Sequence, residues 1–114
     1  MSNMINREQI QNKLASQETF VLLEVLPARY YAAAHLPGAI NISLDHLREA
    51  APTLLPDKRA FIVVYCSNIQ CQNSTIASHE LEQMGYSNVY KYAGGKQDWI
   101  EAGLPVLATA EVVS

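Results

Sequence analysis

The sequence predicts an α/β fold with a central, mainly parallel β-sheet and helices on both of its faces. Apolar runs of strand length at residues 20–25, 61–65 and 89–92 alternate with segments of helical pattern. Such alternation is typical of parallel sheets, because each crossover between parallel strands needs a covering segment, usually a helix. The run at 61–65 contains only β-branched and aromatic residues, so we expect this strand to be covered on both faces.

Local signals place the elements of the N-terminal half. Asn6 can cap a helix over residues 7–16, and Gln9 stands three residues later, as a capping box requires. A further helix is expected at 44–50. Residues 52–58 include two prolines and are expected to form a connecting loop.

In the C-terminal half, a helix is expected over residues 75–84, closed by Gly85. Gly94 and Gly95 then interrupt the chain before a helix that carries Trp99. We expect the two glycines to allow close backbone approach beside the polar loop at residues 67–74. Trp99 lies at helical spacing behind them and is expected in the core.

Length and composition indicate a single domain over residues 1–114 and exclude several classes of protein. Of the 114 residues, 49% are hydrophobic and 17% are charged, as in ordinary globular domains. The net charge of −3 offers no basic surface for nucleic acid. No segment is long and apolar enough to span a bilayer, and residues 1–11 lack the apolar core of a signal peptide. We therefore expect a cytoplasmic protein that binds neither nucleic acid nor membrane.

Cys66 is the strongest candidate for a catalytic residue, because it lies where the buried strand at 61–65 ends and a polar loop leads into the next helix. In parallel α/β sheets, ligands bind at the carboxyl ends of the strands. Loop N–H groups and the N-terminus of the following helix favour the thiolate, which is the reactive form. We expect the side chain to be partly exposed. The alternative is a buried structural cysteine, which is the commoner role of a lone Cys.

Three motifs, in order along the chain, resemble the signatures of rhodanese-like domains. Residues 35–41 read His-Leu-Pro-Gly-Ala-Ile-Asn, and residues 63–66 read Val-Val-Tyr-Cys. The third motif lies within 94–106 and comprises Gly-Gly, a Trp and Ala-Gly-Leu-Pro-Val. The resemblance covers about residues 5–107, which leaves a short polar N-terminus and a C-terminal tail.

The resemblance implies a compact single domain with sulfurtransferase activity. In this family a cysteine accepts sulfane sulfur from thiosulfate, a polysulfide or a persulfide, holds it as a persulfide, and passes it to a nucleophilic acceptor, a thiol or a protein. Cys66 matches that cysteine. We expect no cofactor, and two cysteines without clear His partners do not make a metal site. The residues expected to bind the small sulfur-donor anion or persulfide form the active-site loop: Ser67, Asn68, Ile69, Gln70, Cys71, Gln72, Asn73 and Ser74.

The loop departs from the common family pattern at two positions. Ile69 stands where a glycine is usual, and Cys71 stands where a basic residue is usual, as in a less common subgroup whose loops carry a second cysteine. Upstream, the familiar Asp-Val-Arg is replaced by Glu-Val-Leu at 24–26. Tyr30 likewise stands where an acidic residue is usual. The family's Arg at position 26 and its acid at position 30, which could pair with each other, are therefore both missing. Because the usual anion-binding side chain is absent, we expect thiosulfate turnover to be weak.

Cys71 leaves three interpretations open. It is a packed apolar residue, a resolving thiol that converts a Cys66 persulfide or sulfenic acid into a disulfide, or a second sulfur carrier. Two functions remain as alternatives to sulfur transfer for the chain as a whole. The first is a thiol-redox or persulfide-sensing protein that uses Cys66 and Cys71, and the second is a binding module in which Cys66 takes no part in chemistry. A phosphatase is disfavoured, because no Arg follows Cys66 in the chain.

The three histidines make poor partners for Cys66. His35 belongs to the first family motif, where a structural hydrogen-bonding role is expected. His46 and His79 fall within expected helices and should be exposed.

Overall fold

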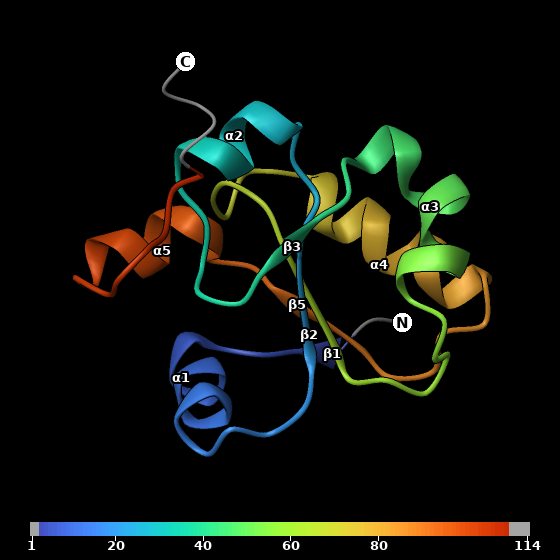
Figure 1. Cartoon of the computed structure of the whole chain (residues 1–114), viewed down its shortest axis with the longest axis horizontal. Helices are drawn as coiled ribbons and strands as arrows, with labels where there is room; N and C mark the ends of the chain where they lie inside the picture. The colour runs from blue at the N-terminus through green and yellow to red at the C-terminus, as the bar shows by residue number, and fades with distance from the viewer. Residues whose placement is uncertain (1–2, 110–114) are drawn as a thin grey trace.

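The computed structural model describes residues 3–109 as a β-sheet surrounded by helices (Figure 1). The strands are β1 (Asn3–Met4), β2 (Val21–Glu24), β3 (Ile40–Asn41), β4 (Ile62–Tyr65) and β5 (Val89–Tyr92). The helices are α1 (Arg7–Ala15), α2 (Ala28–Ala33), the short 3-10 helix η1 (Leu44–His46), α3 (Leu47–Leu54), α4 (Asn73–Gln83) and α5 (Gly95–Glu101). None of the helices in this described part has the length and apolar character needed to cross a membrane.

The strands form one sheet in the order β1-β5-β4-β2-β3, and every neighbouring pair is parallel. This confirms the predicted α/β class. β4 is the central strand, between β2 and β5. Glu24 pairs with Tyr65, and Tyr65 pairs with Tyr92, so the last residues of these three strands lie side by side. The residues that follow them therefore meet at the carboxyl edge of the sheet.

Helices cover both faces of the sheet, as predicted: α3 and α4 lie on one side, and α1 and α5 on the other (Figure 1). Side chains alternate between the two faces along a strand. Val64 and Cys66 accordingly belong to the buried cluster that includes residues of α3 and α4. Tyr65 belongs to the opposite cluster, with Trp99 of α5. Cys66 therefore lies on the α4 side of the sheet.

Several local predictions are confirmed by the structure. The capping box of α1 is present, since Asn6 Oδ1 accepts from the Gln9 N–H (2.8 Å) and Gln9 Oε1 accepts from the Asn6 N–H (2.9 Å). β5 has the predicted bounds. Gly85 follows the end of α4 with a φ of 99°, in the left-handed region that favours glycine.

The predicted loop at 52–58 is wrong in its first three residues, because α3 continues to Leu54. Pro52 supplies no N–H group, which removes one helical hydrogen bond. The helix nevertheless closes, since the Leu55 N–H donates to the Ala51 carbonyl at 2.7 Å and the Leu55 side chain is buried.

Two further differences concern short elements and helix bounds. The sequence pattern does not predict β1, α2 or β3, because segments of two to six residues are too short to show a period. α4 begins at Asn73, two residues before the predicted start. Asn73 and Ser74 therefore belong to the first turn of α4, not to the loop.

Candidate active site

Cys66 directly follows β4 at the carboxyl edge of the sheet, where the sequence predicts the site. The residue is only 1% exposed, so the expectation of a partly exposed cysteine is wrong. The reason is the alternation along the strand, which turns Cys66 into the buried cluster that also contains Val25, Leu26 and Ala77. The cysteine is thus shielded from solvent in this state.

The Cys66 sulfur is joined to Cys71 in a disulfide. The two Cα atoms are 6.4 Å apart, within the range of about 4.4–6.8 Å that disulfides require. Ser74 Oγ lies 3.5 Å from Cys66 Sγ, and the Cys71 carbonyl oxygen lies 3.6 Å from it. No N–H group of residues 3–109 donates to this sulfur. The expected cradle of loop amides is therefore absent from the disulfide form and stays a prediction for the thiolate.

Two asparagines shape the loop between Cys66 and α4. Asn68 accepts the Gln70 N–H at its side-chain oxygen and the Cys71 N–H at its carbonyl, both at 3.0 Å. This turn brings Cys71 back toward Cys66. Asn73 donates from Nδ2 to the Val25 carbonyl at 3.0 Å, which ties the start of α4 to the end of β2. Both asparagines therefore position the loop.

The remaining predicted loop residues do not bond to the sulfur. Ile69 is 77% exposed, and Gln70 and Gln72 are also exposed. Ser67 is half-buried, and its carbonyl accepts the Gln97 N–H of α5 at 2.8 Å. Of the predicted loop set, the structure brings only Cys71 and Ser74 into bonded or hydrogen-bonding contact with Cys66.

Gly95 allows the start of α5 to approach the backbone of the active loop, as expected of the Gly-Gly pair. Its φ is 65°, and a Cβ at this position would lie 2.6 Å from the Cys66 carbonyl oxygen and 3.0 Å from the Asn68 nitrogen. The next residue, Lys96, donates its backbone N–H to the same Cys66 carbonyl at 2.9 Å. Only glycine fits here, because both the left-handed backbone and the short contacts exclude a side chain.

Sequence reasoning missed a buried ion pair beside this contact. Glu24 is fully buried at the end of β2 and accepts hydrogen bonds from the Tyr65 hydroxyl (2.7 Å) and from Lys96 Nζ (2.9 Å). Lys96 Nζ also donates to the Tyr30 carbonyl at 2.9 Å. Burial, and next the negative charge of Glu24, raise the pKa of the Tyr65 hydroxyl. Tyr65 therefore remains a hydrogen-bond donor to Glu24 at neutral pH.

The ion pair involves one residue that departs from the family pattern. Glu24 stands at the position of the usual Asp, and its cationic partner comes from α5, 72 residues along the chain. The acidic Glu24 at the end of the apolar strand β2 was a signal in the sequence that a cationic partner is buried nearby. No local pattern identifies that partner as Lys96.

A recess of about 440 Å³ adjoins the loop that follows Cys66. Its surface is mostly apolar, and its lining includes Leu26, Tyr30 and Ile100. The charged residues of the lining are Lys96 and Glu101. Its volume is in the range of about 300–1,000 Å³ that is usual for small-molecule sites. The recess is therefore able to hold the organic part of a substrate.

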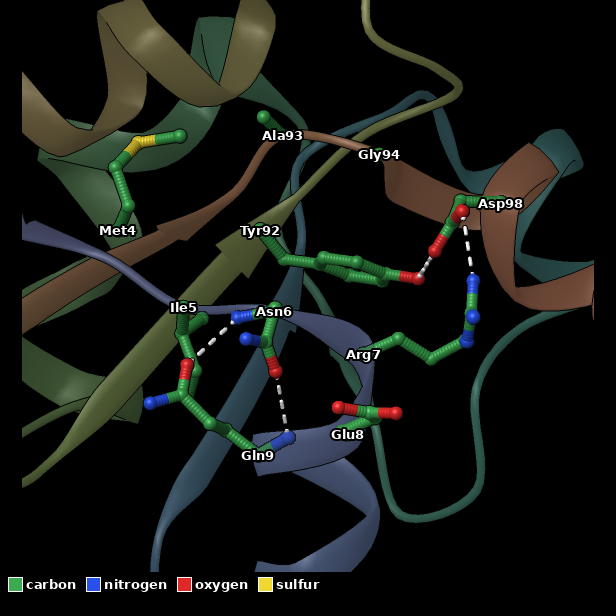
Figure 2. Close-up of a pocket in the computed structure, with 10 residues that line it drawn as sticks. All are labelled: Met4, Ile5, Asn6, Arg7, Glu8, Gln9, Tyr92, Ala93, Gly94 and Asp98. Atoms are coloured by element: carbon green, nitrogen blue, oxygen red, sulfur yellow. Dashed lines mark hydrogen bonds and ion pairs between the residues drawn. The ribbon is translucent and has the colours of Figure 1, made fainter.

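A larger cavity of about 570 Å³ lies at the starts of α1 and α5 (Figure 2). Three of its polar side chains bond to one another: Arg7 Nη1 lies 2.8 Å from Asp98 Oδ1, and the Tyr92 hydroxyl donates to Asp98 Oδ2. Burial and the hydrogen bond to Asp98 raise the pKa of Tyr92, which keeps this donor protonated. The charges of Arg7 and Asp98 thus partner each other and, with the Tyr92 hydroxyl, link α1, β5 and α5.

The histidines and Trp99 have the roles expected from the sequence. His35 Nδ1 lies 2.7 Å from the Tyr31 carbonyl, and its ring stacks on the Tyr31 ring. His46 and His79 are exposed. Trp99 is buried, and its Nε1 donates to the Pro105 carbonyl at 2.8 Å. Residues 3–109 contain no group of three or more His, Cys, Asp or Glu side chains arranged to hold a metal ion.

Comparison with known proteins places this architecture in a family. The profile of the rhodanese-like domain matches residues 6–102. The chain is 37% identical over 76 residues to thiosulfate sulfurtransferase PspE of Escherichia coli, which covers 67% of this chain and 70% of PspE. It is 30% identical over 108 residues to a sulfurtransferase of Allochromatium vinosum, which covers 95% of this chain and 97% of that protein. A solved structure of a rhodanese with anions from E. coli matches with a TM-score of 0.66 and 32% identity, covering 79% of this chain and 99% of that chain.

The chain therefore belongs to the rhodanese-like domain family, and its relatives include sulfurtransferases. Some relatives are longer. The chain covers 60% of the length of a chloroplastic rhodanese-like domain-containing protein of Arabidopsis thaliana.

Proposed function

We propose that the protein is a sulfurtransferase in which Cys66 accepts sulfane sulfur as a persulfide and passes it to a nucleophilic acceptor. The observation that carries the proposal is the place of Cys66, at the carboxyl end of the central strand and against the first turn of α4. Ser74 Oγ, in that turn, lies 3.5 Å from the sulfur. A helix N-terminus and a hydroxyl donor both stabilise a thiolate and the negative charge of a persulfide.

The proposed reaction consists of two displacements. The Cys66 thiolate attacks the outer sulfur of the donor, and sulfite leaves from thiosulfate or a thiolate leaves from a persulfide. The acceptor then attacks the outer sulfur of the Cys66 persulfide, and the Cys66 thiolate leaves. Because the disulfide occupies Cys66 in the structure, the form that accepts sulfur is the reduced chain.

Organic persulfides and polysulfides are proposed as better donors than thiosulfate. Thiosulfate carries two negative charges, and this loop has Cys71 where a basic residue is usual. Lys96 lines the neighbouring recess, but its ammonium group lies 2.9 Å from the buried Glu24 carboxylate and offers little net positive charge. The apolar lining contributed by Leu26 and Ile100 suits the organic part of a persulfide instead.

A thiol-redox function is the second candidate, and the Cys66–Cys71 disulfide favours it. In that case the two cysteines cycle between dithiol and disulfide, and no sulfur is carried to an acceptor. The two functions differ in whether an external nucleophile receives a sulfur atom: it does so in sulfur transfer and does not in the redox function.

Turnover with cyanide as acceptor tests the proposal. The reduced, desalted protein is mixed anaerobically with glutathione persulfide and cyanide, and thiocyanate is measured above the rate without protein. We expect Cys71→Ser to form thiocyanate and Cys66→Ser to form none. Thiocyanate formed at the same measurable rate by both variants would rule out Cys66 as the sulfur carrier. No thiocyanate from either variant would favour the redox function.

A further inference from the structure

A persulfide on Cys66 has two sulfur atoms, and the structure gives them different neighbours. The inner sulfur is Cys66 Sγ itself, which belongs to a residue 1% exposed and is bonded to Cys71 in the disulfide. The outer sulfur is the atom received from the donor, and an acceptor must attack this atom to complete the transfer. The two atoms are therefore open to different nucleophiles.

We propose that Cys71 attacks the inner sulfur of the Cys66 persulfide and releases hydrosulfide, which gives the protein a second activity as a sulfide-releasing persulfide reductase. The inference rests on the proposed function, because it requires the Cys66 persulfide to form. It adds a second fate for the sulfur and a reductant as a further partner.

The loop holds Cys71 in position for this attack. The Cys71 N–H donates to the Asn68 carbonyl at 3.0 Å, and Asn68 Oδ1 holds the Gln70 N–H at the same distance. Asn73 fixes the other end of the loop to the Val25 carbonyl at 3.0 Å. A thiol held in this way acts at an effective concentration far above that of a free thiol.

Cys71 has an advantage over external thiols in reaching the inner sulfur, because it belongs to the same packed site. Cys66 lies in the cluster with Val25, Leu26 and Ala77, and Cys71 is half-buried against the same cluster. An external thiol must enter this packed site from solvent, as the sulfur donor does, whereas Cys71 already contacts Cys66 Sγ. We therefore expect Cys71 to attack the inner sulfur faster than an external thiol does.

The atoms and electrons of the proposed step balance. The Cys71 thiolate forms a bond to Cys66 Sγ, the bond between the inner and outer sulfurs breaks, and the outer sulfur leaves as hydrosulfide with the electron pair. With an organic persulfide as donor, one persulfide and two thiols of the chain yield one thiol, the Cys66–Cys71 disulfide and one hydrogen sulfide. The donor sulfur is reduced and the two cysteines are oxidised. A dithiol reductant must then reduce the disulfide before the chain accepts sulfur again.

The test is a single turnover with glutathione persulfide on the reduced chain, under anaerobic conditions and without added reductant. Wild type, Cys71→Ser and Cys66→Ser are compared by released sulfide and by intact mass after alkylation. Cys66→Ser supplies the background sulfide of the donor itself. Because Cys71 packs against the core, Cys71→Ala is run as a second variant, and far-UV circular dichroism checks that each variant is folded.

The expected result is about one sulfide per wild-type chain above background, with the chain two hydrogens lighter and resistant to alkylation. Cys71→Ser and Cys71→Ala should instead retain one additional sulfur and release no sulfide. If wild type also retains the sulfur, on Cys66 or on Cys71, and releases none, the inference is overturned while the sulfurtransferase function stands. If no protein gains sulfur and none loses hydrogen, both proposals fail together.

Discussion

Removing the ammonium group of Lys96 should destabilise the fold strongly, because it leaves a buried carboxylate without its cation. The Glu24 carboxylate accepts hydrogen bonds from two side chains, Tyr65 and Lys96, and in Lys96→Met only the bond from the Tyr65 hydroxyl remains. Glu24 is fully buried, and the Lys96 side chain is 12% exposed, so water does not readily replace the lost partner. Methionine retains most of the aliphatic length of lysine, which limits the loss of packing.

The expected cost is about 3–5 kcal/mol, the range found when one partner of a buried ion pair is removed. For a domain of this size that corresponds to a fall in Tm of roughly 12–20 °C. The double variant Glu24→Gln/Lys96→Met has no buried charge left to solvate. We therefore expect it to be more stable than Lys96→Met by about 2 kcal/mol.

Urea denaturation followed by circular dichroism measures both effects, with Glu24→Gln completing the double-mutant cycle. The m-value should stay constant, so that a change in midpoint reports stability. The reasoning is refuted if Lys96→Met costs less than about 1 kcal/mol, or if adding Glu24→Gln destabilises it further.

Three other predictions concern the loop contact, the pH dependence and the donor. In urea denaturation, Gly95→Ala should lower the free energy of unfolding by about 1–3 kcal/mol more than Gly103→Ala does. Both glycines have a positive φ, but of the two only Gly95 has backbone atoms within 4 Å of the added Cβ. Equal losses would show that these contacts do not matter. Burial and then the charge of Glu24 raise the pKa of Tyr65 in the folded chain above the unfolded value of about 10. Its stabilising contribution is therefore full below about pH 10 and is lost as pH rises above that value. The free energy of unfolding should accordingly fall from about pH 10 to pH 11, and fall less in Tyr65→Phe; a greater fall in that variant contradicts this. Finally, the kcat/KM of wild type should be higher with glutathione persulfide than with thiosulfate. Cys71→Arg should raise thiosulfate turnover about tenfold to a hundredfold over Cys71→Ser, because the arginine supplies a charge-assisted hydrogen bond. No increase would show that a side chain at this position does not reach the anion.

The parts of the fold that were predictable from the sequence are those with strong local signals. The unbroken apolar run before Cys66 identifies the central strand, and the capping box of Asn6 and Gln9 identifies the start of α1. The two-residue strands β1 and β3 carry no such signal, because they form only by pairing with neighbours that are distant in sequence.

The candidate site was predictable in its position but not in its geometry. The strand-to-helix transition locates Cys66 at the carboxyl edge. Which face the sulfur takes depends on the side-chain alternation and on the packing of α4, so its burial was not foreseen. The Glu24–Lys96 pair depends on two segments 72 residues apart, and the contact between Gly95 and the Cys66 carbonyl depends on the docking of α5.

The central claim is that Cys66 carries sulfur, and peptide mass spectrometry tests it most directly. Reduced Cys71→Ser is treated with glutathione persulfide, desalted, alkylated and digested, with Cys66→Ser/Cys71→Ser as the matched control. The account predicts one additional sulfur on the peptide that contains Cys66, and no addition to the double variant. An unchanged Cys66 peptide, or an equal gain of sulfur in the double variant, would contradict it.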